Sequence, residues 1–221
     1  MSDMKTIRIT GRGHTKVFPD TTRIMITLGG VYEEYSDALE HSIRDARQLK
    51  EMLSEYDFDR GEVKTLSFGV DTEYERYKEN DEYKERFAGY RYTQRLKLEF
   101  TSDNLRLGKI LYALSTSPFH PELRLGYAVS DPEQARNFVL GQAIKDAKEK
   151  AEALTRAAGV TLGDIQNIDY SWGEIDFEVN PIHGDLRMMA AAMDESECYD
   201  LDIEADAIDF SNTVTVIWEI K

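Results

Sequence analysis

The apolar residues near the N-terminus recur at every second position, which predicts strands. Ile7 and Ile9 alternate with polar neighbours, and a second alternation begins at Ile24, after Pro19-Asp20. Successive side chains of a strand point to opposite faces, so a period of two indicates strands with one buried face. The segment Gly11-Arg-Gly-His14 separates the two alternations, and we expect it to form a tight turn or bulge with positive φ at its glycines.

Three segments show apolar residues at spacings of three and four, the period of an amphipathic helix. They run from about 35 to 56, from about 103 to 115 and from about 132 to 158. The side-chain oxygen of an N-cap residue accepts a hydrogen bond from a free backbone N–H of the first turn. The expected N-caps are Ser36 for the first helix, Ser102 or Asp103 for the second and Asp131 for the third.

The third helix carries further end signals. Pro132 suits the first helical position, where its missing N–H costs nothing. Gly159 suits the left-handed residue that commonly ends a helix. These signals predict the longest helix of the chain.

A period of two returns in several later segments and predicts more strands. They lie at about 66–74, 90–100, 123–129, 165–179 and 208–220. The charged segment 75–86 has no Pro or Gly, and we expect a solvated extension of a hairpin there rather than a helical turn. Strands in hairpin-like order, interrupted by helices, indicate an α+β fold, in which the three helices pack on an antiparallel sheet. No linker marks a boundary, so we expect a single domain over residues 1–221.

The charge balance of the chain excludes some classes of binding partner. There are 27 Lys and Arg against 42 Asp and Glu, which gives a net charge of −15. Nucleic acid and anionic membranes are therefore not expected as general partners. No apolar run is long enough for a transmembrane segment, and the N-terminus lacks a signal-peptide pattern. We expect a cytoplasmic protein, or a periplasmic one if a leader has been removed.

No residue pattern predicts a catalytic, cofactor-binding or metal site. Gly11-Arg12-Gly13 lacks the third glycine that opens a phosphate-binding helix. Cys198 is the single cysteine, and its acidic neighbours should keep the thiol protonated and inert. The four histidines are placed in a turn, a helix and two loops, without catalytic or ligand spacing: His14, His41, His120 and His183. We therefore expect a protein that is not an enzyme and holds no cofactor or metal.

Two alternatives stay open. One is an enzyme that uses scattered carboxylates with His120 or His183, since general acid–base work needs only spatial convergence. The other is a cation-binding module in the acidic segment 194–209, where four carboxylates alternate with other residues: Asp200, Asp202, Glu204 and Asp206. A solvated sheet edge, whose charges discourage aggregation, explains the same acidic pattern and is favoured.

Three segments, taken in order, resemble the SIMPL domain family. They are Ile9-Thr-Gly-Arg-Gly-His14 with Val17-Phe-Pro-Asp20, then Gly89-Tyr-Arg-Tyr-Thr-Gln94, and most specifically Ala143-Ile-Lys-Asp-Ala-Lys-Glu-Lys-Ala-Glu-Ala-Leu154 running on to Gly163. The resemblance covers about Lys5 to Lys221. It implies bacterial relatives linked to oxidative-stress tolerance, some of which form ring-like oligomers, and a mammalian relative that binds a kinase. It brings no catalytic motif.

The leading hypothesis is a non-enzymatic oligomeric interaction or scaffold protein, with a homo-oligomer and a protein partner as its expected contacts. The hairpin around segment 75–86 offers a tyrosine-rich contact surface: Tyr74, Tyr77, Tyr83, Tyr90 and Tyr92. Amphipathic strand packing explains Tyr90 and Tyr92 equally well. We expect the two acidic segments, the stretch after Asp194 and the hairpin from Glu73 to Glu85, to lie outside the closest subunit contacts or to face Lys and Arg such as Lys78, Lys84 and Arg86 of a neighbour.

Overall fold

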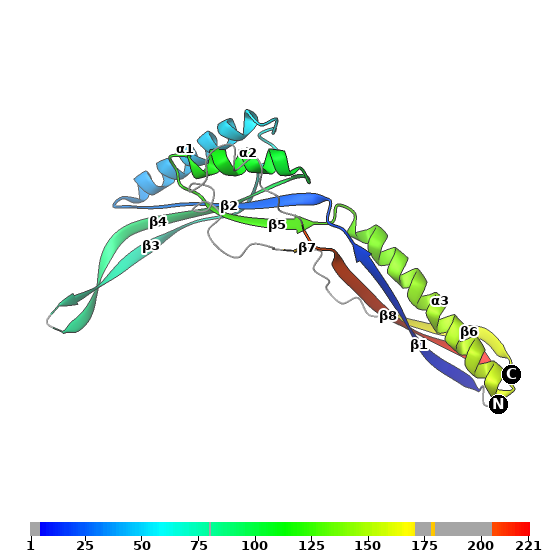
Figure 1. Cartoon of the computed structure of the whole chain (residues 1–221). Coiled ribbons are helices and arrows are strands. Elements are labelled where there is room, and N and C mark those ends of the chain that lie inside the picture. Colours follow the sequence, from blue (N-terminus) through cyan, green and yellow to red (C-terminus); the bar gives the residue numbers. More distant parts are fainter. Residues whose placement is uncertain (1–4, 80, 171–177, 180–204) are drawn as a thin grey trace. The chain divides into compact units, whose positions relative to one another are not determined.

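The computed structural model describes residues 5–79, 81–170, 178–179 and 205–221 (Figure 1). Helices pack on antiparallel sheets, so the predicted α+β class is confirmed. The chain divides into two compact units, which are described separately. The terminal unit comprises Met1–Pro19, Val129–Glu178 and Asp206–Lys221, and the central unit comprises Asp20–Ala128 and Val179–Ala205. The single domain over 1–221 stays a prediction.

The terminal unit is a three-stranded sheet with one helix on it. The strand order is β1 (Thr6–Val17), β8 (Ile208–Ile220), β6 (Leu162–Tyr170), and both neighbouring pairs are antiparallel. Helix α3 (Pro132–Ala158) packs mainly on β1 and β8. The buried core between them combines small helix residues with large strand residues: Ala143, Ala147, Ala151, Val214, Val216 and Trp218.

Strand β1 runs without interruption through the two glycines at positions 11 and 13. Gly11 pairs with Val214 and Gly13 with Asn212, and neither glycine has a positive φ. The predicted turn at this segment is therefore wrong, and His14 lies in a strand. The glycines instead permit close contact with α3. A Cβ on Gly11 would lie 2.0 Å from the carbonyl oxygen of Ala143, and one on Gly13 equally close to that of Val139.

The helix ends agree with the sequence except at α1. Helix α3 has Asp131 as its N-cap, whose side chain accepts from the N–H of Gln134 at 3.0 Å, and Gly159 follows with φ 70°. In α2 (Asn104–Ser115) the cap is Asp103. Helix α1 (Tyr35–Ser54) begins after Glu34, which forms no side-chain cap. The predicted cap at Ser36 is wrong, because the chain is already helical there.

The central unit is a five-stranded sheet in the order β3, β4, β2, β5, β7, and Figure 1 shows α1 and α2 on one of its faces. The strands are β2 (Thr21–Tyr32), β3 (Lys64–Glu79), β4 (Glu82–Thr101), β5 (Glu122–Ala128) and the two-residue β7 (Glu178–Val179). Alternate residues of the strands and the apolar faces of the helices form the core, including Ile24, Ile26, Leu28, Leu49, Leu53, Leu96, Leu98, Leu107 and Leu111.

Strands β3 and β4 form a long hairpin. The pairing continues through Tyr77↔Lys84 to Glu79↔Glu82, so the predicted hairpin extension is confirmed. The last predicted strand, at 208–220, is confirmed as β8. In place of the expected strand at 165–179, the structure has β6, which begins at Leu162, and the short strand β7. Residues 171–177 lie outside the described part.

Candidate functional site

One face of the β3–β4 hairpin carries a row of aromatic rings in edge-to-face contact. The ring of Tyr74 lies 5.9 Å from that of Phe87, Phe87 lies 5.3 Å from Tyr90, and Tyr90 lies 5.7 Å from Tyr35 of α1. Tyr74 is 57% exposed and Phe87 is 49% exposed. The register shift at Glu73/Tyr74 explains this alignment, because it brings Phe87 opposite Tyr74. Half-exposed rings held in place by their neighbours suit a protein contact.

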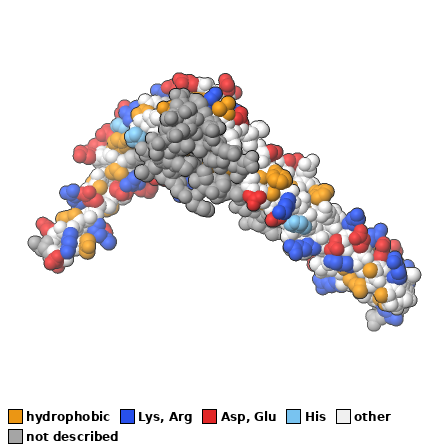
Figure 2. Space-filling view, viewed as in Figure 1, with side chains coloured by type: hydrophobic (Ala, Val, Ile, Leu, Met, Phe, Trp, Pro, Cys, Tyr) orange, Lys and Arg blue, Asp and Glu red, His pale blue; other side chains and the backbone are white. Residues whose placement is uncertain are grey.

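Ten charged residues between Glu73 and Arg91 form ion pairs within the hairpin, and Figure 2 shows positive, negative and hydrophobic side chains along it. Five ion pairs involve residues of both strands and the turn: Arg91–Glu73, Arg86–Glu75, Arg76–Glu85, Lys84–Glu79 and Lys78–Asp81. The hydrogen bond from Arg91 lowers the pKa of Glu73. The three cations expected to face a neighbour, Lys78, Lys84 and Arg86, thus have acidic partners in their own hairpin.

The five tyrosines singled out in the sequence divide into two groups. Tyr92 is fully buried and Tyr90 is half-buried, which confirms that strand packing accounts for both. The other three, Tyr74, Tyr77 and Tyr83, are exposed on the hairpin. They are available for the contact surface that the sequence suggests.

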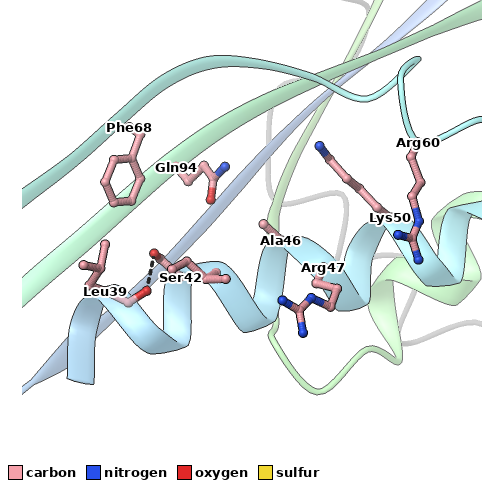
Figure 3. Close-up of a pocket in the computed structure, with 9 residues that line it drawn as sticks. Leu39, Ser42, Ala46, Arg47, Lys50, Arg60, Phe68 and Gln94 are labelled. Carbon is pink, nitrogen blue, oxygen red and sulfur yellow. Dashed lines mark hydrogen bonds between the residues drawn. The ribbon is translucent and has the colours of Figure 1, made fainter. Parts of the chain in front are cut away.

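A groove of about 510 Å³ lies between α1 and the strands β3 and β4. We call it the α1–β3 groove. Its apolar lining includes Leu39, Ile43 and Ala46 from the helix and Phe68 from β3, and Figure 3 shows Phe68 and Gln94 facing the helix. Ile43 is 54% exposed and Phe68 is 48% exposed. The helix therefore leaves part of its apolar face, and of the sheet beside it, without cover from the described residues.

Among the described residues, the charged ones that line this groove are all basic: Arg47, Lys50 and Arg60. Arg60 forms an ion pair with Glu51 at 3.2 Å. Within the described ranges, Arg47 and Lys50 form no ion pair. Since acids outnumber bases in the chain, this lining reverses the overall charge balance.

The same groove borders an open sheet edge. Strand β3 is the first in the order of the five-stranded sheet and pairs only with β4 among the described residues. Backbone groups on the outer side of an edge strand have no ladder partner and can accept a further strand. A helix beside an open edge strand, with an apolar groove between them, is a geometry used for peptide binding by strand addition.

A second hollow, of about 420 Å³, contains the buried carboxylate Asp45 of α1. The hydroxyl of Tyr92 donates to this carboxylate at 2.5 Å, and the guanidinium of Arg44 lies 3.3 Å from its other oxygen. Burial and the bond to Asp45 raise the pKa of Tyr92. This hydrogen bond joins α1 to β4 inside the core, which is a structural role for the pair.

Two of the described histidines belong to the central unit and one to the terminal unit. In the central unit, the ring of His41 lies 4.1 Å from that of Tyr32, which lines the same hollow as His120. His120, at a positive φ of 42°, lines the hollow with Asp45, but no hydrogen bond joins the two in the part of the chain that the structure describes. His41 on α1 has its Nδ1 2.8 Å from the carbonyl oxygen of Asp37. His14 on β1 lies 3.7 Å from Asp209. His183 lies outside the described residues.

The proposed acidic cation site also falls largely outside the described residues. Of its four carboxylates only Asp206 is described, and Cys198 is likewise outside. No cluster of three potential metal ligands occurs within residues 5–79, 81–170, 178–179 and 205–221. In the same ranges, no helix has the length and apolar character needed to cross a membrane.

The apolar spacing of segment 35–56 predicts an amphipathic helix but does not predict the groove. The signal was present, because the apolar stripe of α1 is wider than its core contact. The buried residues of the stripe include Ala38, Leu49 and Leu53, whereas Leu39 and Ile43 remain exposed. Which side of a wide stripe stays uncovered depends on the width of the sheet beneath it.

Comparison with known proteins identifies the family of the chain. No curated protein matches the chain. A family model, SIMPL, described as a protein of unknown function (DUF541), matches residues 7–218. This match covers nearly the whole chain, including β1, the β3–β4 hairpin and α3, so the resemblance noted in the sequence is confirmed. The chain belongs to the SIMPL family.

Proposed function

We propose that this SIMPL-family protein is a non-enzymatic interaction protein that assembles with copies of itself through the β3–β4 hairpin. The observation that carries the proposal is the exposed aromatic row, in which Phe87 contacts both Tyr74 and Tyr90. Aromatic residues supply much of the binding energy of protein interfaces. A role in stress tolerance, as the family resemblance implies, would be exercised through such an assembly.

Charge favours a second copy as the occupant. A chain with net charge −15 repels its copies, so assembly is least opposed where the local charge is near zero. Segment 75–86 contains five acidic and four basic residues, and its cations are paired internally. Two hairpins can approach through their aromatic faces with little like-charge repulsion.

Two carboxylates that could serve an enzyme, those of Asp45 and Asp146, form hydrogen bonds within the fold. The carboxylate of Asp45 accepts from Tyr92, and that of Asp146 accepts from Lys150 and from the backbone N–H of Arg12. These bonds give a structural role to the buried carboxylate of Asp45 and to that of Asp146, which lies beside the edge strand β1. They support the non-enzymatic assignment.

Light scattering over a range of protein concentrations tests the proposal. The wild-type mass should be a multiple of 25.4 kDa. The double variant Tyr74→Ser, Phe87→Ser should raise the dissociation constant of the assembly by about tenfold or more, because two interface aromatics are lost. The matched control Phe138→Ser, Ile165→Ser removes two similarly exposed apolar residues of the terminal unit and should leave the mass unchanged. A strict monomer at high concentration would overturn the proposal.

A further inference from the structure

We infer that the α1–β3 groove binds an extended acidic peptide segment of a partner protein, which adds to strand β3. The inference concerns a partner other than a second copy and does not depend on self-assembly. It rests on three features of the central unit: an open strand edge, an apolar groove beside it and a basic lining.

The open edge supplies backbone hydrogen bonds. Strand β3 pairs with β4 on one side, and no described strand pairs with its other side. An extended peptide that lies antiparallel or parallel to β3 can use these free N–H and C=O groups. Backbone bonding of this kind gives affinity that is independent of the peptide's sequence.

The groove supplies side-chain selection. Because successive residues of a strand point to opposite faces, alternate side chains of an added peptide would point toward the helix-covered face of the sheet. On that face they would meet Phe68 and the exposed side of α1 at Leu39 and Ile43 (Figure 3). Small or medium apolar side chains at alternate positions fit a groove of about 510 Å³.

The basic lining determines the sign of the charge that the partner segment carries. Arg47, Lys50 and Arg60 line the groove, and none of the other described lining residues is acidic. In a chain with 42 acids and 27 bases, such a surface selects a negatively charged ligand against the overall field of the protein. The partner segment therefore carries Asp or Glu, as well as apolar residues, at the alternate positions that face the groove.

The test uses two labelled peptides of about eight residues, the length of a typical strand. One has Val and Glu in turn at the alternate positions that face the groove, with Thr at the positions between them, and the other has Lys in place of every Glu. A non-specific attraction to this acidic protein would favour the Lys peptide. The groove should instead bind the Glu peptide about tenfold or more tightly than the Lys peptide, as measured by fluorescence anisotropy.

Matched variants locate the site. Lys50→Glu should weaken binding of the Glu peptide by about tenfold, because it reverses one lining charge and engages Arg47 one turn away. Lys5→Glu makes the same charge change on the terminal unit and should leave binding unchanged. Circular dichroism checks that both variants fold. Bound Glu peptide should also slow amide hydrogen exchange in residues 66–72 of β3, which a purely electrostatic contact would not do.

Several outcomes would overturn the inference. They are equal or tighter binding of the Lys peptide, equal weakening by Lys5→Glu, unchanged exchange in β3, or no binding of the Glu peptide at roughly 1 mM, where even a weak site is populated. Binding of dodecanoate in place of the peptide would assign the groove to an anionic amphiphile. Loss of self-assembly in Lys50→Glu without peptide binding would assign it to a second copy. The Tyr74→Ser, Phe87→Ser variant should bind the Glu peptide as wild type does, which separates this test from that of the proposed assembly.

Discussion

The edge strands β1 and β3, one from each sheet, differ in whether side chains of the helix on the sheet reach their outer backbone groups. In the terminal unit, side chains of α3 reach the outer edge of β1. Asp146 accepts from the backbone N–H of Arg12 at 2.7 Å, Gln142 lies 3.5 Å from that of His14, and Lys150 lies 3.5 Å from the carbonyl oxygen of Thr10. In the central unit, the described helices leave the outer edge of β3 open.

The difference follows from how each helix contacts its sheet. Helix α3 carries alanines at a spacing of four that approach the glycines of β1, so helix and edge strand come close enough for side chains to reach the strand's backbone. Helix α1 contacts mainly β2 and β4, and its Asp45 bonds to Tyr92 of β4. A helix held over the inner strands cannot also cover the edge. One edge is thereby protected from further pairing, and the other stays available.

The largest expected effect tests the close contact in the terminal unit. In Gly11→Val, the added Cβ would lie 2.0 Å from the carbonyl oxygen of Ala143 and 2.5 Å from the backbone nitrogen of Ala147. Backbone atoms of a helix cannot move aside cheaply, so the free energy of unfolding should fall by about 3 kcal/mol. Denaturant unfolding followed by circular dichroism measures the change.

A second glycine provides the control for this prediction. Gly141 lies within α3, and a Cβ there would meet nothing within 4 Å. Gly141→Ala should therefore raise the free energy of unfolding by up to about 1 kcal/mol, the difference in helix propensity. Equal stability of Gly11→Val and the wild type would show that α3 does not pack against β1 at this point.

The next effect tests how α1 is held over the inner strands of the central unit. Tyr92→Phe removes the donor to Asp45 and leaves a buried carboxylate oxygen without that bond. The free energy of unfolding should fall by about 1–3 kcal/mol, the usual cost of an unsatisfied buried polar group. The same measurement on Tyr83→Phe is the control, because the Tyr83 side chain is 73% exposed and its change should be near zero. Equal losses in both variants would contradict an anchoring role for the Tyr92–Asp45 bond.

The sequence predicted most elements because their signals are local. The alternation of β8 and the end signals of α3, Asp131 and Gly159, depend on a few neighbouring residues and are confirmed. The glycines of β1 do not form the predicted turn. They permit close contact with α3, a helix more than a hundred residues away in the chain, and no local pattern shows this. The α1–β3 groove was missed for a related reason: exposure of Ile43 depends on which strands α1 covers, and the helix sequence does not encode that.

The smallest expected effect concerns the carboxylate that protects the edge of β1. The hydrogen bonds from Lys150 and then from the N–H of Arg12 lower the pKa of Asp146 below its ordinary value of 3.8. The folded state thus has the lower pKa and the unfolded state the ordinary one. Between these two values the unfolded state binds a proton more readily, so the free energy of unfolding falls as the pH drops through that range. Above the ordinary value the contribution of Asp146 is fully present.

Asp146→Asn keeps an acceptor for Arg12 but removes the charge. The variant should be less stable than the wild type at neutral pH, and the difference should shrink as the pH is lowered from about 5 toward the depressed pKa. Glu149→Gln is the matched control on α3, since the Glu149–Lys145 pair is exposed at 3.9 Å and contributes little. The measurement is the free energy of unfolding across this pH range. If the difference between Asp146→Asn and the wild type stays constant, the charge of Asp146 does not stabilise the contact with β1. In that case the packing of α3 alone protects this edge strand.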